Sequence, residues 1–486
     1  MTSHGNRESR SNSPKRSGAG LPRIPSGPRF FPREPLSRFP IADHHRPRWA
    51  NICAGELGLD FTNCVHATFE LRGPLHLAAL QESVRALVQR HSILSARVAG
   101  APAGPEFVLD PHREASLGLV DFSHIDAGQR RAFAARAAGD LIWKPFASET
   151  EAWFRVFAMT LTANKHVIGF VVHHFICDLW STRIMVNELL SLYKALAAGL
   201  QPSLPELRLQ YSDYVIGMNE WLRSGEADST SAYWRDILRN APPTRVPPDC
   251  LVAADRTGPI ATQSSHLPPD SVTKLRHLGR SRGIAMSALI AAAMAAVVAH
   301  FSSSGDIVIV KRILGRRDPS LLCLVGAFFD SIALRISISM NATFNALASQ
   351  VHRTLMQSYV HDNYPYQLVK SSLPQIGASD VAPMLNFSDT GTDDSPGRKN
   401  STLLRPFELP PRPVIMTSAG RYTGFNTRVS IDSRGLHIRA EYLGLLYSEA
   451  TAARFVQTFC DLLQQASLLP ERPLASLLKG ISCTAP

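Results

Sequence analysis

The chain has 486 residues and is 45% hydrophobic, which is enough for two or three domains or for one large two-lobed unit with a substantial core. Its seven cysteines are odd in number and lack paired spacing, so neither a disulfide framework nor a zinc ribbon is indicated and a reducing cytoplasm fits best. The longest apolar run, 284–299, is shorter than the roughly 20 residues of a membrane helix and contains Ser287. We therefore expect a soluble protein with no membrane span.

The formal net charge of +11 is concentrated at the N-terminus. Residues 1–48 carry ten Lys and Arg against three Asp and Glu, which is +7, and the remaining 438 residues carry only +4. This segment is rich in Ser, Pro and Arg and poor in apolar residues, so we predict a disordered basic tail over 1–40. A docking arm or a targeting segment is the alternative. We expect no nucleic-acid partner, because the folded part is only mildly basic.

The first half alternates strand and helix patterns. Its apolar periodicity predicts strands at 65–71, 93–98, 106–109, 154–159 and 165–172, and helices at 77–90, 127–141, 184–196, 211–222 and 231–238. The segment 241–248 contains four prolines, which continue neither regular structure. We place the boundary between an N-terminal lobe, 41–240, and a C-terminal lobe, 249–480, in this linker.

The second half continues the alternation. It predicts helices at 271–280, 284–300, 344–359 and 449–466, strands at 306–310 and 328–338, a polar loop at 389–400, and a hairpin that pairs 427–431 with 436–442. The class is therefore α+β, in two lobes of similar length.

The most site-like stretch is His173-His174-Phe175-Ile176-Cys177-Asp178. It lies where a buried strand gives way to a helix whose start Ser181 or Thr182 can cap. Strand side chains alternate, so only one of the two histidines can face a substrate. That histidine is a general base or a polar anchor; the alternatives are buried structural histidines before a capping aspartate, or a metal site, which the diverging histidines disfavour.

Other common catalytic signatures are absent from the sequence. The chain has no Gly-x-Ser-x-Gly elbow, no P-loop, no dinucleotide fingerprint and no Cys-x-x-Cys pair. A covalent serine hydrolase and a nucleotide-dependent enzyme are therefore not expected.

The histidine stretch, with Trp180 and Ser181 behind it, resembles the His-His-x-x-x-Asp motif of condensation domains from nonribosomal peptide synthetases, within the chloramphenicol-acetyltransferase-like superfamily. Further similarities follow in order across about 62–478. They are Arg90-His91 with Leu94, Gln210 to Tyr214, Tyr233-Trp234, Gly315-Arg316, Val325 to Ser331, His361 to Tyr366, and Pro383 to Phe387.

The resemblance implies a V-shaped pseudo-dimer of two acetyltransferase-like lobes with an active-site tunnel between them. It implies a catalytic motif of His173, His174 and Asp178, in which His174 is the base or positions the nucleophile. Asp178 is structural and pairs with Arg316. The candidates for lining the tunnel or the substrate are Leu179, Trp180, Ser181, Asn386 and Asp330.

The implied reaction transfers an acyl group from a thioester to an amine or a hydroxyl, as in natural-product biosynthesis. The resemblance implies no intrinsic cofactor and no metal, because the donor arrives on the phosphopantetheine of a carrier protein or on coenzyme A. The expected partners are a peptidyl or acyl carrier protein and a small amine or alcohol. We expect a free-standing enzyme, because no adenylation domain or carrier segment fits the sequence. We also expect a monomer.

The chain departs from the family pattern next to the motif. Leu179 stands where the family usually has Gly, and Asp330 stands where it has Asn. Because a glycine would leave space in the tunnel, a leucine there narrows the channel, changes acceptor choice or abolishes turnover. A catalytically silent binding module and an acyltransferase that uses coenzyme A thioesters therefore remain open beside the carrier-dependent enzyme.

Overall fold

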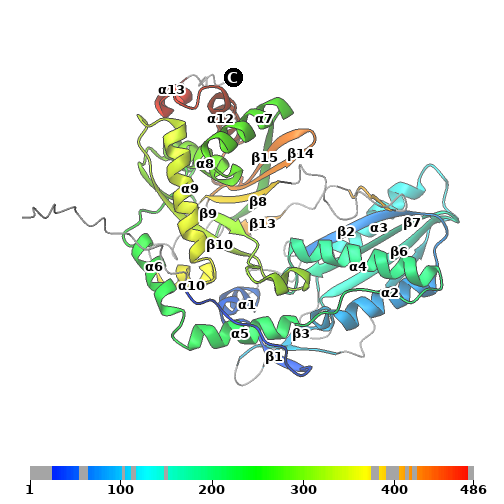
Figure 1. Ribbon diagram of the computed structural model, residues 1–486. Helices are drawn as coiled ribbons and strands as arrows, with labels where there is room; N and C mark the ends of the chain where they lie inside the picture. Colours follow the sequence, from blue (N-terminus) through cyan, green and yellow to red (C-terminus); the bar gives the residue numbers. More distant parts are fainter. Residues whose placement is uncertain are drawn as a thin grey trace, which may run out of the picture.

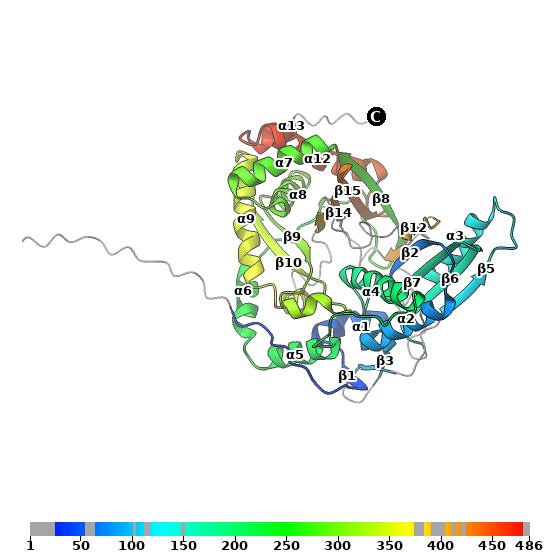
Figure 2. The same ribbon diagram turned by 45° about the vertical axis from the view of Figure 1, so that its right-hand side comes forward.

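The computed structural model describes residues 25–53, 64–100, 104–110, 117–146, 151–373, 383–389, 404–410, 415–418 and 424–479. Two lobes meet at one end and diverge at the other, so the molecule is V-shaped (Figures 1 and 2). This agrees with the expected two-lobed α+β class. The described residues contain no single helix that is long and apolar enough to cross a membrane. The helices Pro269–Arg282 and Met286–Ser302, bent by 108° at their junction, pass the same length and composition test as a pair.

The α-helices are α1 (Arg46–Cys53), α2 (Leu77–Arg90), α3 (Arg130–Trp143), α4 (Leu179–Ala197), α5 (Tyr211–Arg223), α6 (Asp228–Leu238), α7 (Pro269–Arg282), α8 (Met286–Ser302), α9 (Phe344–Val360), α10 (Tyr366–Ser372), α12 (Glu449–Leu468) and α13 (Leu474–Lys479). The 3₁₀ helices are Asp43–His45, Ser92–Ser95 and Pro319–Cys323.

The strands are β1 (Arg38–Pro40), β2 (Cys64–Arg72), β3 (Arg97–Ala99), β4 (Glu106–Val108), β5 (Leu117–Asp121), β6 (Phe154–Thr162), β7 (Lys165–His173), β8 (Thr257–Leu267), β9 (Asp306–Ile313), β10 (Asp330–Ser337), β11 (Met384–Asp389), β12 (Leu404–Pro406), β13 (Met416–Ser418), β14 (Asn426–Asp432) and β15 (Gly435–Leu443).

The first lobe is built on a five-stranded sheet in the order β12-β2-β7-β6-β5. β7 lies between antiparallel β2 and β6, and every residue of it after Lys165 is buried. Helix α4 contacts β2 and α2, and α3 contacts β6 and β7. The sheet therefore holds the end of β7, where the histidines lie, in a rigid frame.

The second lobe is built on a seven-stranded sheet in the order β10-β9-β11-β14-β15-β8-β13. Helix α8 is buried around its whole circumference from Ala288 to Ala299, as expected of an all-apolar helix in the core of a protein, and it contacts α9 and α12. The predicted hairpin is present, with Thr427 opposite Ala440. The predicted loop at 389–400 lies outside the described residues except for Asp389, which ends β11.

The two lobes exchange segments, so the boundary is not where the sequence placed it. The segment 241–248 has no helix or strand, but α6, which precedes it, already packs its Trp234 and Leu238 into the core of the second lobe. In the other direction, β12 pairs with β2 and Phe407 enters the core of the first lobe. Local proline content marks a loop, whereas these exchanges depend on tertiary packing.

The prediction of disorder through residue 40 is wrong for residues 25–40. Strand β1 pairs antiparallel with β4, and the rings of Phe39 and Phe107 lie 5.1 Å apart in the core. Phe30 packs on Tyr214, with ring centroids 5.4 Å apart. Composition averages over the segment, whereas a few isolated aromatic residues are enough to dock it. Residues 1–24 lie outside the described part.

The predicted strand at 93–98 is also wrong over its first half. Residues Ser92–Ser95 form a 3₁₀ turn after α2, and only Arg97–Ala99 is a strand. The Ser95 hydroxyl donates to the Ser92 carbonyl over 2.8 Å, a local bond that competes with strand pairing. Both Ile93 and Leu94 are buried, which an alternating strand pattern does not produce.

Candidate functional site

The site begins at the junction of β7 and α4. β7 ends at His173, and α4 begins at Leu179 with Asp178 as its N-cap, because Asp178 Oδ1 accepts from the Ser181 backbone N–H over 2.7 Å. The expectation that Ser181 or Thr182 caps the helix is therefore wrong. The aspartate lies one turn earlier and presents a stronger, charged acceptor.

His173 lies in an aromatic core. It is fully buried, its ring lies 4.7 Å from the Trp153 ring, and its Nδ1 accepts from the Phe175 backbone N–H over 3.3 Å. It is therefore placed to support the shape of the turn rather than to meet a substrate.

His174 has a different environment. It is half-buried, and its ring packs on Phe329 of the second lobe with centroids 4.5 Å apart. Its Nδ1 lies 2.7 Å from the Cys177 carbonyl, which only accepts, so Nδ1 carries the proton and donates. In the neutral ring, Nε2 then holds the free lone pair.

Two arginines surround His174 with positive charge. Arg48 on α1 donates to the His174 carbonyl over 3.3 Å, and both Arg48 and Arg312 lie 5.4 Å from the Phe329 ring centre. Burial, followed by the charge of Arg48, lowers the pKa of His174 to about 3. Burial and the charge of Arg312 lower the pKa of Arg48 to about 10. His174 is thus neutral at physiological pH, in a field that favours negative charge.

Asp178 is the centre of a buried polar network. Its carboxylate forms an ion pair with Arg316 at 3.0 Å, which is the pair expected from the sequence, and it accepts from the Ser181 hydroxyl and from the Phe328 backbone N–H. Arg316 also donates to the carbonyls of Leu321 and Leu324. All of these groups are buried, so the network fixes the start of α4 against the segments that carry Arg316 and Phe328.

Two glycines allow the chain to approach this network. Gly315 has φ +70°, and a Cβ there would overlap the Phe328 carbonyl oxygen. At Gly326 a Cβ would lie 2.2 Å from the Tyr211 ring. Both positions belong to the segments that carry Arg316 and Phe328, so they fix how those residues reach Asp178.

Of the residues predicted to line the tunnel, Ser181 is wrongly assigned. It is fully buried, and its hydroxyl accepts from Arg316 and from the Gly326 backbone N–H. Trp180 is half-buried and donates from Nε1 to the Leu322 carbonyl over 2.8 Å. Leu179, the first residue of α4, is 66% exposed, so its side chain is available to a ligand or a partner.

The structure does not bring the two remaining candidates to His174. Asp330 accepts from the Ser331 and Tyr366 backbone N–H groups, and burial raises its pKa to about 7. Asn386 is half-buried on β11, and no hydrogen bond or ring contact within the described ranges joins it to His174. In those ranges no group of three or more His, Cys, Asp or Glu side chains is placed to hold a metal.

Sequence reasoning missed Arg48, Arg312 and Phe329 as neighbours of His174. They come from α1, from β9 and from the segment before β10. Their approach is set by the packing of the two lobes, and no local spacing indicates it. The one pattern in the sequence that could have indicated Arg48 is Arg48-Trp49, an arginine beside a tryptophan in a basic segment.

Comparison with known proteins identifies the family and the fold. The model of the condensation domain matches residues 63–479. A linear gramicidin synthase from Brevibacillus parabrevis is 26% identical over 84% of this chain, which spans 5% of that protein's length.

Two solved structures show the same fold. The condensation domain of the Monacolin K polyketide synthase MokA has a TM-score of 0.74 at 16% identity, covering 90% of this chain and 99% of that one. The X-domain in its complex with OxyB from teicoplanin biosynthesis has a TM-score of 0.73 at 20% identity, covering 96% and 99%. The chain belongs to the condensation-domain family.

Proposed function

We propose that the chain is a condensation enzyme of the cytoplasm. It transfers an acyl group from the phosphopantetheine thioester of a carrier protein to an amine or a hydroxyl, through a tunnel between the lobes. The observation that carries this proposal is the hydrogen bond of the His174 ring. Its Nδ1 is fixed as a donor to the Cys177 carbonyl, which leaves Nε2 as the acceptor for the nucleophile's proton.

The low pKa of His174 limits what the residue does before substrate binds. At a pKa of about 3 the ring is a weak base, and it serves first as a neutral acceptor that orients the nucleophile. When the tetrahedral intermediate forms, its oxyanion introduces a negative charge nearby. That charge raises the basicity of Nε2 at the moment when the proton is transferred.

The two arginines support the same step. Arg48 and Arg312 are both close enough to His174 to depress its pKa, so an oxyanion formed beside the ring is attracted by both charges. In a partly desolvated site this attraction is larger than in water. A thioester is already activated, so alignment of the reactants and charge stabilisation supply the remaining acceleration.

The experiment compares product formation by the wild type and by His174→Ala. The donors are an acyl carrier protein loaded with an acyl group and the matching acyl coenzyme A, each given a pool of amines and alcohols. We expect His174→Ala to lose about 10²- to 10⁴-fold in rate.

The matched control is His124→Ala, which removes an exposed histidine from the loop between β5 and α3 and leaves the rate unchanged. Equal rates for the wild type and His174→Ala would overturn the role of His174. If the coenzyme A thioester reacts faster than the loaded carrier protein, coenzyme A takes the place of the carrier protein in the proposal.

A second candidate function is a binding module without turnover. The observation that favours it is Leu179, which is 66% exposed directly beside the motif, together with the likeness to a fold found in complex with OxyB. If it is correct, neither donor gives product while binding of a carrier or protein partner persists, and Leu179→Gly does not restore turnover.

A further inference from the structure

Asp330, the first residue of β10, lies one strand away from the histidine site. The ring of its neighbour Phe329 packs on His174. The hydroxyl of its other neighbour, Ser331, accepts from Arg312 over 3.3 Å, and these two residues are paired across β9 and β10. Successive side chains of an extended segment alternate between its two sides, so the Asp330 carboxylate points away from His174. It can therefore affect the proposed reaction through its charge.

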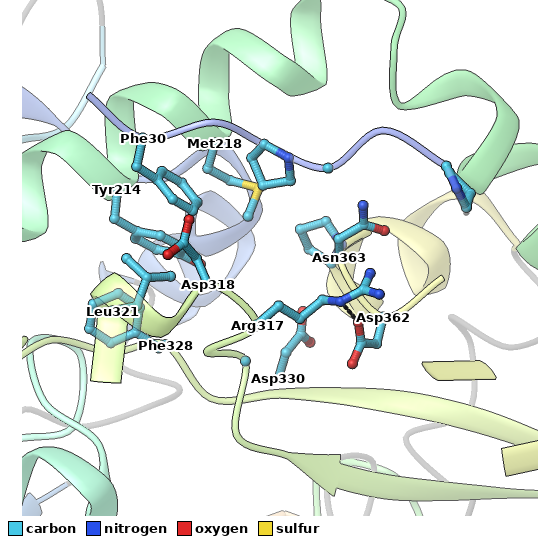
Figure 3. Close-up of a pocket in the computed structure, with 15 residues that line it drawn as sticks. Phe30, Tyr214, Met218, Arg317, Asp318, Leu321, Phe328, Asp330, Asp362 and Asn363 are labelled. Carbon is cyan, nitrogen blue, oxygen red and sulfur yellow. Dashed lines mark ion pairs between the residues drawn. The ribbon is translucent and has the colours of Figure 1, made fainter. Parts of the chain in front are cut away.

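On the far side of the strand, Asp330 lines a cavity of about 280 Å³ where the two lobes meet (Figure 3). Its carboxylate accepts from its neighbour's backbone N–H over 2.7 Å and from the Tyr366 backbone N–H over 3.2 Å. The charged and titratable side chains around it are Arg312 on β9, Tyr214 on α5, Tyr366 on α10, and Arg317, Asp318 and Asp362 of the cavity wall. Of these, Arg317 forms its ion pair with Asp362, over 3.1 Å.

This environment makes Asp330 change its charge near neutral pH. Burial raises the pKa of Asp330 to about 7, and the charge of Asp362 acts in the same direction. The charge of Arg312 opposes that shift. The coupling is mutual, because burial lowers the pKa of Arg312 and the charge of Asp330 opposes that change in turn. Asp330 is therefore mostly uncharged below about pH 6 and mostly ionised above about pH 8.

Arg312 connects Asp330 to the histidine site. Its guanidinium lies 5.4 Å from the centre of the Phe329 ring, and the same ring packs on His174. After burial and the charge of Arg48, the charge of Arg312 also lowers the pKa of His174. An oxyanion formed beside His174 is attracted by Arg312, and an ionised carboxylate one strand behind Arg312 offsets part of that attraction.

We propose that Asp330 is a charge switch for the His174 site, which offsets the charge of Arg312 when it is ionised and thereby slows the condensation reaction as the pH rises. This inference rests on the proposed function. Asp330 stands where the family usually has Asn, which stays uncharged across this pH range. An asparagine at this position should therefore remove the switch.

The first experiment follows the ionisation of Asp330 without any substrate. Carboxyl ¹³C NMR of aspartate-labelled protein, with Asp330→Asn to assign the resonance, gives its titration midpoint. We expect a midpoint near pH 7. It should move up by at least about half a pH unit in Arg312→Gln, which removes the cation, and stay close to the wild-type value in Arg312→Lys. The matched control is Arg353→Gln, at an exposed arginine of α9, which leaves the midpoint unchanged.

The second experiment compares the reaction rates of the wild type and Asp330→Asn, with the same loaded carrier protein and the same acceptors. The asparagine still offers an oxygen to the Ser331 and Tyr366 backbone N–H groups. The ratio of the two rates cancels the titration of the donor and of the acceptor. We expect the variant to be faster by about 5- to 10-fold at about pH 8.5, with a ratio that falls toward one at about pH 5.5, as for one charge acting over several ångströms in a partly desolvated site.

Asp270→Asn, which removes an exposed carboxylate at the start of α7, is the matched control, and its rate ratio to the wild type stays the same at every pH. Thermal unfolding verifies that every variant is folded. If the wild type gives no product with either donor, the proposed function fails, while the NMR titration still decides whether the two charges are coupled. A midpoint below about pH 5, an unchanged midpoint in folded Arg312→Gln, or a pH-independent rate ratio for folded Asp330→Asn would each overturn the charge switch.

Discussion

Two polar residues of the motif, His174 and Asp178, lie four positions apart and have opposite surroundings. Asp178 is buried, and its carboxylate accepts from Ser181, Arg316 and Phe328. His174 is half-buried, and one of its ring nitrogens is committed to the Cys177 carbonyl. A saturated ion pair is suited to hold a shape, whereas a histidine with a free lone pair is suited to react. The comparison predicts that Asp178 variants lose the fold and His174 variants lose the chemistry.

The largest effect is expected at the ion pair. Asp178→Ala leaves Arg316 buried without its counter-charge, so the free energy of unfolding should fall by about 3–5 kcal/mol. Chemical denaturation measures this change. Arg183→Ala, which removes an arginine near Trp180 on the same helix, is the control and should change stability by less than about 0.5 kcal/mol. A fall at Asp178 no larger than the control's would contradict the structural role.

The next effect is expected at Ser181. Ser181→Ala removes the acceptor for Arg316 and for the Gly326 backbone N–H, so we expect a loss of about 1–3 kcal/mol in the free energy of unfolding. The control is Ser320→Ala, at an exposed hydroxyl in the 3₁₀ helix Pro319–Cys323. If both variants have the same free energy of unfolding, the Ser181 hydroxyl does not stabilise the network around Asp178, and Ser181 is wrongly assigned to it.

The pH dependence of stability tests the surroundings of His174. The pKa of His174 is lowered to about 3 from an ordinary value near 6.5, so between these values the unfolded chain binds a proton that the folded chain does not. Stability therefore falls as pH falls, by up to about 1.4 kcal/mol per pH unit from this group. His44, whose pKa burial lowers to about 4, acts in the same direction.

The variant His174→Gln isolates that contribution. Its free energy of unfolding should fall less steeply than the wild type's between about pH 6 and pH 4, as measured by denaturation at several pH values. Parallel curves for the two proteins would show that His174 titrates normally in the folded state.

The smallest effect on stability is expected at Leu179. Because its side chain is 66% exposed, Leu179→Gly should cost no more than about 1 kcal/mol, mostly from the helix propensity of glycine. The informative readout is the range of acceptors turned over, which should widen if the leucine restricts the tunnel. An unchanged acceptor range at full stability would remove Leu179 from the site.

Local pattern was enough for much of the fold. The periodic burial of α2 and the all-apolar α8 follow from 3.6-residue spacing, and the motif comparison paired Asp178 with Arg316 across 138 positions. Sequence reasoning failed where packing between distant segments decides the outcome. The docking of residues 25–40 and the approach of Arg48 to His174 both depend on which surfaces the lobes bring together.

The most direct test of the different roles of His174 and Asp178 is the protonation state of His174. Two-bond ¹H–¹⁵N NMR of histidine-labelled protein, with His174→Gln to assign the resonance, reports which ring nitrogen carries the proton. We predict a neutral ring with the proton on Nδ1 from pH 8 down to about pH 5, because the Cys177 carbonyl fixes the tautomer and burial with Arg48 suppresses the second proton. A proton on Nε2, or titration near pH 6.5, would contradict the account.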